Sequence, residues 1–448
     1  MDKGADLIAA ISTATGPGAV AMIRLSGRGA LDALGRFFKP NRSLVDNPRQ
    51  LILGKVVSHL DGALLDHAMA AWFPGPSSFT GEDSVELQGH GGSLLPKLTL
   101  ELALASGARL ARPGEFTERA FLNGRLSLDQ AEAVAEIVAS ESRAEARIAA
   151  KALDGALRGR VLPLFDSLKG SLAFLTGILD FEEDWTERNS NRVLEELGRL
   201  KEGMGELIEL RKSGKPYREG LRVVLAGPPN AGKSALFNAL LGKRRAMVST
   251  VPGTTRDYLT ASVTWSSVRV ELVDTAGLRD GGQDELESMG QELAREQISD
   301  ADLVLWLHDG LEPPCPVSLD REHSPPILEV WNKADGHPNP GGPEGPPGPW
   351  ISAMTGRGLA ALKEEILKMA GVSEDGVPEI VPNLRQQIAL EQSYACLLQA
   401  EGSLLAGEVP EIAGMILRDS LDHLGAITGR VFTDELLEEV FRHFCLGK

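Results

Sequence analysis

The segment GPPNAGKS, residues 227–234, most constrains how this 448-residue chain can fold. It matches the pattern G-x-x-x-x-G-K-[ST], follows the apolar stretch LRVVLA and precedes the helical stretch SALFNALLG, which is the context that this motif requires. Its glycines let successive backbone N–H groups surround a phosphate, Lys233 can reach the β and γ oxygens, and Ser234 can bind Mg²⁺. This context disfavours the alternative, a glycine turn that only caps a helix. The segment therefore predicts a nucleotide site.

Three later segments indicate that the nucleotide is GTP. The segment DTAG, 274–277, ends an apolar strand and places Asp274 near the metal and its glycine N–H near a γ-phosphate. The segment NKAD, 332–335, also follows a strand, and Asp335 can accept both guanine N1–H and N2–H, which adenine does not offer. The segment SAM, 352–354, takes the place of the loop that backs the base. In this order they resemble the motif set of small guanine-nucleotide-binding domains.

The group that positions the attacking water is not the usual one. GTPases that use a glutamine carry it directly after the DTAG glycine, where this chain has Leu278, which cannot hold a water. Arg256 and Arg279 lie in expected loops, where a loop ion pair is the better interpretation than a catalytic arginine. The acidic stretch DELE leaves Glu287 and Glu285 as candidates, with an exposed acidic helix start as the alternative.

The composition and the apolar patterns along the chain predict a multidomain fold, α/β plus all-α. Residues 1–118 read as an N-terminal α+β domain. Residues 119–217 and 373–448 are rich in helix formers, which indicates one discontinuous helical domain. Residues 218–372 alternate strand and helix patterns, as expected of an inserted Ras-like P-loop G domain with a largely parallel sheet.

Two local features refine this outline. Ser127 is followed three residues later by Gln130, which fits a capping box, so we expect a helix to begin there and helical structure to continue to about residue 212. The segment 336–349 is nearly all Gly and Pro and predicts a surface loop with no assigned function.

The composition excludes several classes of protein. Three cysteines without paired spacing argue against a disulfide scaffold and favour a reducing cytoplasm. No uninterrupted apolar run reaches the roughly 18 residues typical of a membrane span, and the first residues lack a secretory signal. The formal charge of −17 means that nucleic acid would be bound through a local patch or with a basic partner.

Longer strings carry a resemblance to a known family. NAGKS, PGTTRD and DTAGLRD, flanked by FTGEDSVELQGHGG, ARPGEFTERAFLNGRLSLDQAEAV and a terminal CLGK, resemble the MnmE (TrmE) family of tRNA-modification GTPases. The resemblance implies an N-terminal folate-binding and dimerising domain, and therefore a homodimer. It also implies a heterotetramer with the flavoprotein MnmG (GidA) that modifies carbon 5 of the wobble uridine in tRNA. The bridging carbon would come from a tetrahydrofolate derivative, 5-formyl- or methylene-tetrahydrofolate.

The same resemblance implies the residues of the GTP site. Mg²⁺ would be held by Ser234 and Thr255, and K⁺, in place of an arginine finger, by Asn230 with Ser249, Val251 and Thr254. The implied GTP-binding residues are Asn230, Ala231, Gly232, Lys233, Ser234, Ala235, Ser249, Thr250, Val251, Thr254, Thr255, Asp274, Thr275, Ala276, Gly277, Asn332, Lys333, Asp335, Ser352 and Ala353. Glu287 matches the family's water-orienting glutamate, although one extra residue after DTAGLRD keeps Glu285 as the second candidate.

The resemblance also places residues around a folate. Arg24, Glu86 and Arg125 match folate-contacting positions, with an ion pair at a domain interface as the alternative for each. Lys448 matches the terminal group near the folate, and Cys445 the cysteine of the modification chemistry, with a structural thiol as the alternative. We interpret His90, Cys315 and Cys396 as structural residues.

A function of another class fits the G-domain motifs alone. A GTP-dependent binding switch, such as a ribosome-assembly GTPase, would need the same nucleotide loops. It would have no use for a folate pocket or for the CLGK tail. Bound folate or a change in wobble-uridine modification would separate the two functions.

Overall fold

The computed structural model describes residues 6–14, 16–58, 61–179, 186–242, 259–274, 297–314, 316, 325–336, 348–372, 376–442, 444, 445 and 447. The chain forms two compact units. The first contains residues 1–139, 149–205 and 384–448, and the second contains residues 140–148 and 206–383.

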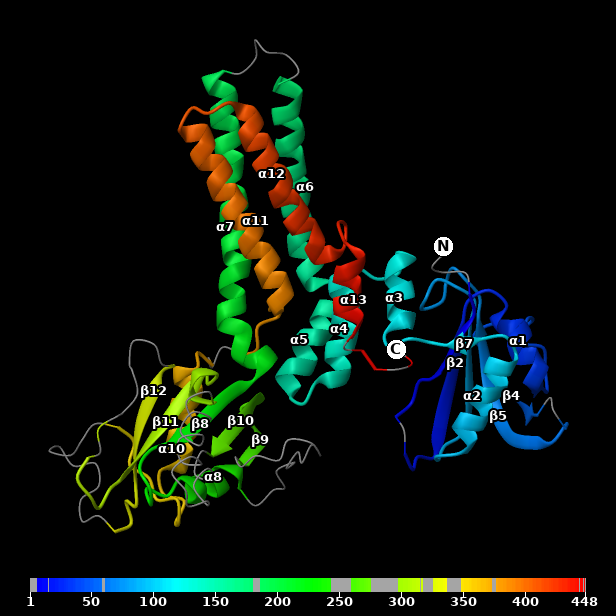
Figure 1. The fold of residues 1–448 in the computed structure, drawn as a ribbon, viewed down its shortest axis with the longest axis horizontal. Helices are drawn as coiled ribbons and strands as arrows, with labels where there is room; N and C mark the ends of the chain where they lie inside the picture. Colours follow the sequence, from blue (N-terminus) through cyan, green and yellow to red (C-terminus); the bar gives the residue numbers. More distant parts are fainter. Residues whose placement is uncertain are drawn as a thin grey trace, which may run out of the picture. The chain divides into compact units, whose positions relative to one another are not determined.

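The first unit begins with a seven-stranded sheet in the order β3-β4-β5-β6-β2-β1-β7 (Figure 1). Its strands are β1 (Ile8–Ile11), β2 (Val20–Ser26), β3 (Phe38–Pro40), β4 (Ile52–Val57), β5 (Leu64–Phe73), β6 (Ser84–His90) and β7 (Arg109–Leu110). Alternate residues, among them Ile23, Leu25 and Leu87, are buried in one core with α1 (Ala30–Phe37) and α2 (Leu95–Ala105). The predicted α+β character of this region is confirmed, with strands at both of its first apolar stretches.

The helical part of the chain is confirmed at its predicted start. The Ser127 N–H donates to Gln130 Oε1 at 3.1 Å, and the helix begins at the next residue. The helices are α3 (Glu115–Leu122), α4 (Leu128–Ala139), α5 (Arg143–Leu153), α6 (Ala156–Leu179), α7 (Glu187–Glu219), α11 (Leu384–Leu405), α12 (Pro410–Thr428) and α13 (Asp434–Arg442).

Among the described residues, helical structure continues as expected to about residue 212, with two breaks between helices. The first break precedes α5, where the Glu145 carboxylate accepts hydrogen bonds from the N–H groups of Glu141 and Ser142. The second lies at Gly155, whose φ of 86° is left-handed and ends α5. A carboxylate that accepts from free N–H groups caps the start of a new helix, and a glycine with a left-handed φ ends one, so a helix-forming composition does not by itself give one continuous helix.

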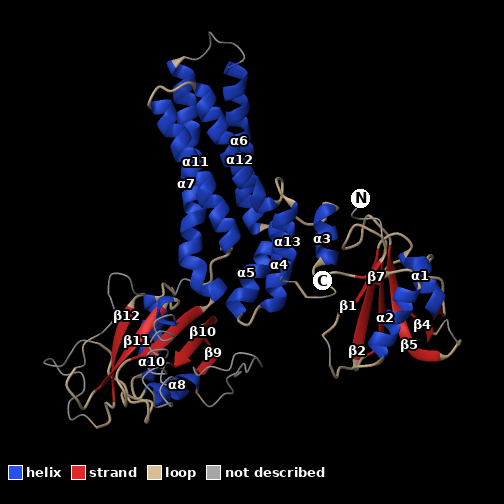
Figure 2. Ribbon diagram, viewed as in Figure 1, coloured by secondary structure: helices blue, strands red, loops and turns tan. Residues whose placement is uncertain are grey.

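Helices α6, α7, α11 and α12 run side by side as a bundle (Figure 2). Lys201 on α7 pairs with Glu401 on α11 at 2.5 Å, and the hydroxyls of Ser393 and Ser420 join α11 to α12 at 2.9 Å. Because the Lys201–Glu401 pair connects segments 200 residues apart, the two helical stretches of the sequence form one bundle.

One helix has a composition that could also suit a membrane. Residues Ala156–Ile178 of α6 are long and apolar enough to span a bilayer, with a mean hydropathy of 1.3. Charged residues interrupt the run in the sequence, at Arg158, Arg160, Asp166 and Lys169. The helix packs against α12 in the bundle, and apolar core helices of soluble proteins have the same composition. The absence of a membrane span therefore stays an expectation.

The second unit contains a five-stranded sheet in the order β12-β11-β8-β10-β9. Its elements are β8 (Leu221–Ala226), α8 (Lys233–Leu241), β9 (Leu259–Trp265), β10 (Val268–Asp274), β11 (Leu303–Asp309), β12 (Ile327–Asn332) and α10 (Leu359–Met369). The three strands predicted before GPPNAGKS, at DTAG and before NKAD are present as β8, β10 and β12, and they run parallel to one another and to β11. β9 was not predicted. It pairs antiparallel with β10 through a turn at Ser266 and Ser267.

Candidate functional site

The loop GPPNAGKS joins β8 to α8, as predicted. The Lys233 side chain is only 9% exposed, and its ammonium donates to the carbonyls of Gly227 and Pro228 at 2.9 Å each. Asn230 and Gly232 adopt left-handed φ values of 63° and 93°. A Cβ on Gly227 would lie 2.4 Å from a carbonyl oxygen of β11, so this position requires glycine. The loop thus has the tight backbone that phosphate binding needs.

The expected guanine loop is hydrogen-bonded to the phosphate loop. Asn332 is 3% exposed, and its Nδ2 donates to the carbonyl of Ala231 at 2.9 Å. Its Oδ1 accepts the N–H of Ala353 at 3.0 Å. The Lys333 ammonium pairs with Asp309 at 2.5 Å. One amide side chain therefore fixes the phosphate loop, the NKAD loop and the SAM loop relative to one another.

Asp335 is placed as a hydrogen-bond acceptor beside this network. It is exposed on the turn after β12. A hydrogen bond from the buried Ser352 hydroxyl lowers the pKa of Asp335 below 3.8, so the carboxylate is ionised at neutral pH. An exposed carboxylate at this place is able to accept the two N–H groups of a guanine edge.

The structure places some of the predicted metal and switch residues. Asp274 ends β10 and is 1% exposed, while Ser234 and Ala235 are exposed on the first turn of α8. The predicted residues that follow α8 and β10 in the sequence lie outside the described residues: Ser249, Thr250, Val251, Thr254, Thr255, Arg256, Thr275, Ala276, Gly277, Leu278, Arg279, Glu285 and Glu287. Within the described part of the chain, no group of three or more His, Cys, Asp or Glu side chains could hold a metal ion.

The structure brings two of the predicted folate residues into direct contact. Arg24 on β2 lies opposite Glu86 on β6, and Nη2 and Oε1 are 2.8 Å apart. The Arg24 guanidinium also lies over the Phe79 ring, at 5.8 Å from its centroid. Arg125 reaches the same loop, because a Cβ on Gly81 would be 3.4 Å from its Cγ. Lys448 lies outside the described residues.

The C-terminal tail is tied to the N-terminal part of the first unit. Phe444 is 7% exposed and packs in a cluster with Phe121 and Phe441. The backbone of Cys445 accepts a hydrogen bond from Gly114, and the Cys445 side chain is exposed. A Cβ on Gly447, whose φ is 86°, would lie 2.4 Å from a carbonyl oxygen of β1. The tail therefore presents an accessible thiol, with Phe444 as its anchor. Sequence analysis did not predict that Phe444 anchors the tail, because the one signal in the sequence was that this residue is aromatic.

Three residues that we interpreted as structural, one histidine and two cysteines, complete the comparison with the sequence analysis. His90 ends β6, with its ring exposed and its Nδ1 2.6 Å from Asp66. Cys396 is half-buried on α11, and burial raises the pKa of its thiol. Cys315 lies outside the described residues.

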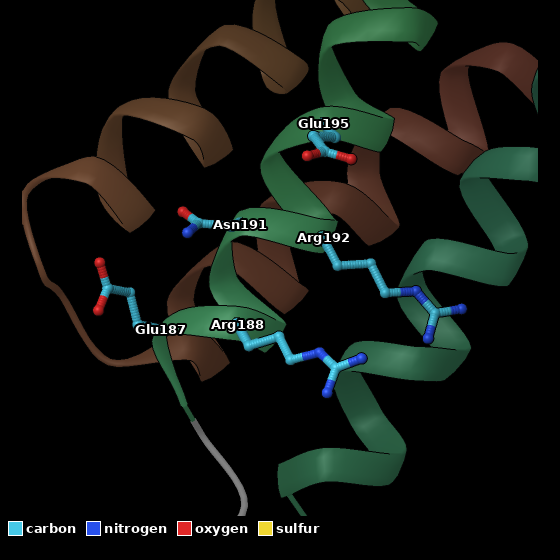
Figure 3. Close-up of a pocket in the computed structure, with 5 residues that line it drawn as sticks. All are labelled: Glu187, Arg188, Asn191, Arg192 and Glu195. Atoms are coloured by element: carbon cyan, nitrogen blue, oxygen red, sulfur yellow. The ribbon is translucent and has the colours of Figure 1, made fainter.

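An open pocket of about 470 Å³ lies apart from these residues, at the start of α7 (Figure 3). Its lining residues all come from that one helix: Glu187, Arg188, Asn191, Arg192 and Glu195. The Arg192 guanidinium stacks over Phe174 at 4.2 Å. None of the predicted site residues lines it, and its mixed charges define no ligand.

Comparisons with known proteins agree with these features. The model of the MnmE helical domain matches residues 128–445, and that of the GTP-binding protein TrmE N-terminus matches residues 7–125. The protein "tRNA modification GTPase MnmE" of Aquifex aeolicus is 38% identical to this chain, and the alignment covers 98% of this chain and 99% of the relative. A relative of the same name from Akkermansia muciniphila is also 38% identical, with 98% of each chain covered. The chain therefore belongs to the MnmE (TrmE) family.

Proposed function

We propose that this chain hydrolyses GTP and takes part in tRNA modification. With a flavoprotein partner of the MnmG type, it would modify carbon 5 of the wobble uridine with a one-carbon unit from folate. One observation carries the nucleotide assignment: Asn332 joins the phosphate loop to the guanine loop through Ala231 and Ala353. The same proposal includes a homodimer and a cytoplasmic location.

The chain's residues supply binding and orientation for hydrolysis. Water attacks the γ-phosphorus, the bond to the bridging β–γ oxygen breaks, and GDP and phosphate leave. Lys233, now bonded to two loop carbonyls, would exchange these for the β and γ oxygens of GTP. Glu287, or Glu285 in its place, would orient the water.

Two cations belong to this site in the proposal. Ser234 and Thr255 would hold Mg²⁺, and the K⁺ ligands would be Asn230, Ser249, Val251 and Thr254. Bound cations neutralise the charge that develops on the phosphate oxygens. The exposed Ser234 and the left-handed Asn230 fit such a role, because both belong to the loop that would surround a bound phosphate.

Residues of the N-terminal sheet and the tail would hold the folate, which supplies the one-carbon unit. Arg24 and Glu86 form a pair whose side chains are 19% and 23% exposed, so their outer edges remain available to a polar ring. Arg125 and Lys448 would contact the rest of the molecule. Cys445 would take part in the modification chemistry. The exposure of its thiol on an anchored tail supports this.

The charge of the chain bears on the RNA partner. A net charge of −17 disfavours broad contact with phosphates, so we infer that the flavoprotein partner makes much of the tRNA contact. Local contacts, among them single cationic side chains, would remain for this chain.

The test is complementation in a host that lacks its own member of the family. Mass spectrometry of nucleosides from purified tRNA should show wobble-uridine modification with the wild type, and none with Lys233→Ala or with a chain that ends at Phe444. Wobble-uridine modification restored by Lys233→Ala would show that the modification does not need GTP bound at this site. Unchanged tRNA with altered ribosomal subunit profiles would favour a ribosome-assembly switch.

A further inference from the structure

A second cavity, of about 240 Å³, lies within the first unit. None of its lining residues is predicted to bind GTP or folate, but two of them, Gly124 and Leu126, flank the predicted folate residue Arg125 in the sequence. Its apolar walls come from Phe121 and Leu122 at the end of α3, from Leu126, and from Phe432 after α12. Phe121 and Phe432 meet edge to face, with ring centroids 5.2 Å apart. Leu122 and Phe432 are 43% and 45% exposed, so the apolar lining continues to the protein surface.

Polar groups line the same cavity and include a buried hydroxyl without a partner. Thr428, in the last turn of α12, is 6% exposed, and its Oγ1 is buried with no hydrogen-bond partner in the described structure. Arg158 on α6 is exposed and makes no hydrogen bond or ion pair with the described residues. A buried hydroxyl without a partner is costly, so Thr428 points to a ligand or water that would complete it.

A buried carboxyl group lies close to these lining residues. Asp129 is 1% exposed, and neither of its oxygens has a hydrogen-bond partner among the described residues. Burial and the charge of Glu132 raise the pKa of Asp129, and the charge of Arg158 partly opposes this. Ser127 and Arg158 both line the cavity, so this buried carboxyl group is adjacent to its lining.

The size and lining define a class of ligand. Drug-sized ligands occupy pockets of roughly 300–1,000 Å³, so about 240 Å³ suits one ring system with a few polar substituents. The apolar and aromatic walls suit a flat ring, Thr428 can bond to a ring carbonyl or N–H, and the exposed Arg158 can pair with an attached phosphate. A pyrimidine nucleotide has all three features.

We propose that this cavity takes a single unstacked pyrimidine nucleotide of the RNA substrate. The inference rests on the proposed function, because that function supplies an RNA whose target base is a uridine in a single-stranded loop. Sequence-specific RNA binding usually targets such loops, whose splayed bases stack on aromatic side chains and bond through their edges. Enzymes that act on bases take the base out of the stack and hold it in a pocket by stacking and by hydrogen bonds to its edge.

The test uses the full chain and a fluorescent anticodon stem–loop RNA with either uridine or an abasic site at the wobble position. Fluorescence anisotropy should show about tenfold weaker binding of the abasic RNA, the order expected for one stacked base. Thr428→Val keeps the shape of the side chain and should reduce this ratio towards one. The matched control, Thr176→Val, removes an exposed hydroxyl of α6 and should leave the ratio unchanged.

Arg158 has its own test and control. Arg158→Gln should weaken the binding of both RNAs and lower the salt dependence of that binding by about one released ion. Arg36→Gln, at an exposed arginine of α1, should leave the salt dependence as it is. GTP hydrolysis should be unchanged in all four variants, since these residues belong to the first unit and the nucleotide loops to the second.

Each other outcome overturns the assignment. Equal binding of uridine and abasic RNA by the wild type would show that the cavity holds no base, while wobble modification in the complementation test would leave the proposed function standing. Equal loss of the ratio in Thr428→Val and Thr176→Val would show a general effect of the substitution. Absence of both RNA binding and wobble modification would overturn the proposed function as well.

Discussion

At the scale of single residues, Asp335 is the side chain that should distinguish guanine from other bases. The Ser352 hydroxyl keeps its pKa low, so it offers acceptors only. Asp335→Asn replaces one acceptor by a donor, and GTP binding should weaken by about 5- to 150-fold while xanthosine triphosphate gains affinity. Calorimetric titration with both nucleotides measures this. Asp300→Asn, at an exposed aspartate of the same unit, is the control. An unchanged preference for GTP would exclude this role.

The ionisation of Glu115 should make the stability of the N-terminal part of the chain depend on pH in the acid range. Burial raises its pKa, but hydrogen bonds from Arg109, the Arg112 N–H and Arg119 outweigh burial and lower the pKa from 4.5 to about 2. The folded pKa is below the unfolded one, so the stabilisation is full above pH 4.5 and is lost as the pH falls towards 2. Glu115→Gln should therefore lower the free energy of unfolding by about 3 kcal/mol at neutral pH.

Calorimetry between pH 2 and 7 measures the Glu115 effect, which should shrink below pH 4.5. The control is Glu118→Gln, whose partner among the described residues, Arg112, is 59% exposed. Removing that outer pair should change the free energy of unfolding by less than about 1 kcal/mol. A difference between wild type and Glu115→Gln that does not vary with pH would contradict the assignment.

At the scale of elements, Arg385 joins three helices. From α11 it pairs with Glu132 on α4 at 2.6 Å, and it donates to the carbonyls of Ala426 and Ile427 at the end of α12. Arg385→Met leaves a buried carboxylate and free helix carbonyls, so we expect a loss of about 3 kcal/mol in the free energy of unfolding. Arg199→Met, at a 69% exposed arginine, should cost less than about 1 kcal/mol. Equal unfolding temperatures would contradict this.

The elements that could be predicted are those whose patterns are local. β11 is a nearly continuous apolar run, and β8 and β10 are apolar with one and two charged residues among their first four, so all three carry a strand pattern over a few neighbouring residues. β9 was missed because it is an edge strand with an irregular burial pattern, and its turn uses two serines with positive φ in place of the usual glycine or asparagine. The break before α5 depends on where the Glu145 carboxylate points, which composition does not reveal.

The candidate site divides in the same way. The phosphate and guanine loops could be predicted because their backbone chemistry requires particular residues at fixed spacing. The Asn332 bonds to Ala231 and Ala353 could not, since they join segments about 100 and 20 residues away. The same holds for the Thr428 cavity, whose walls come from three distant parts of the chain.

At the scale of the whole molecule, the tail connects the last residues to the first strand. Gly447→Ala adds a Cβ 2.4 Å from the Ile11 carbonyl oxygen, which should displace the tail. We expect wobble modification to fall at least several-fold, by nucleoside mass spectrometry, while GTP hydrolysis is unchanged. Gly407→Ala has a similar φ of 74° and no atom within 4 Å, so it isolates backbone strain from displacement. Full modification by Gly447→Ala would show that the tail position is not needed.

The most direct test of the proposed GTPase is single-turnover GTP hydrolysis in KCl and in NaCl, for the wild type and for Glu287→Ala. Hydrolysis by the wild type should need potassium, and Glu287→Ala should lose hydrolysis while it still binds GTP. Equal rates of the wild type in both salts would contradict the potassium site at Asn230. An active Glu287→Ala would contradict the role of Glu287 and transfer it to Glu285, and a wild type that hydrolyses no GTP in either salt would contradict the central claim.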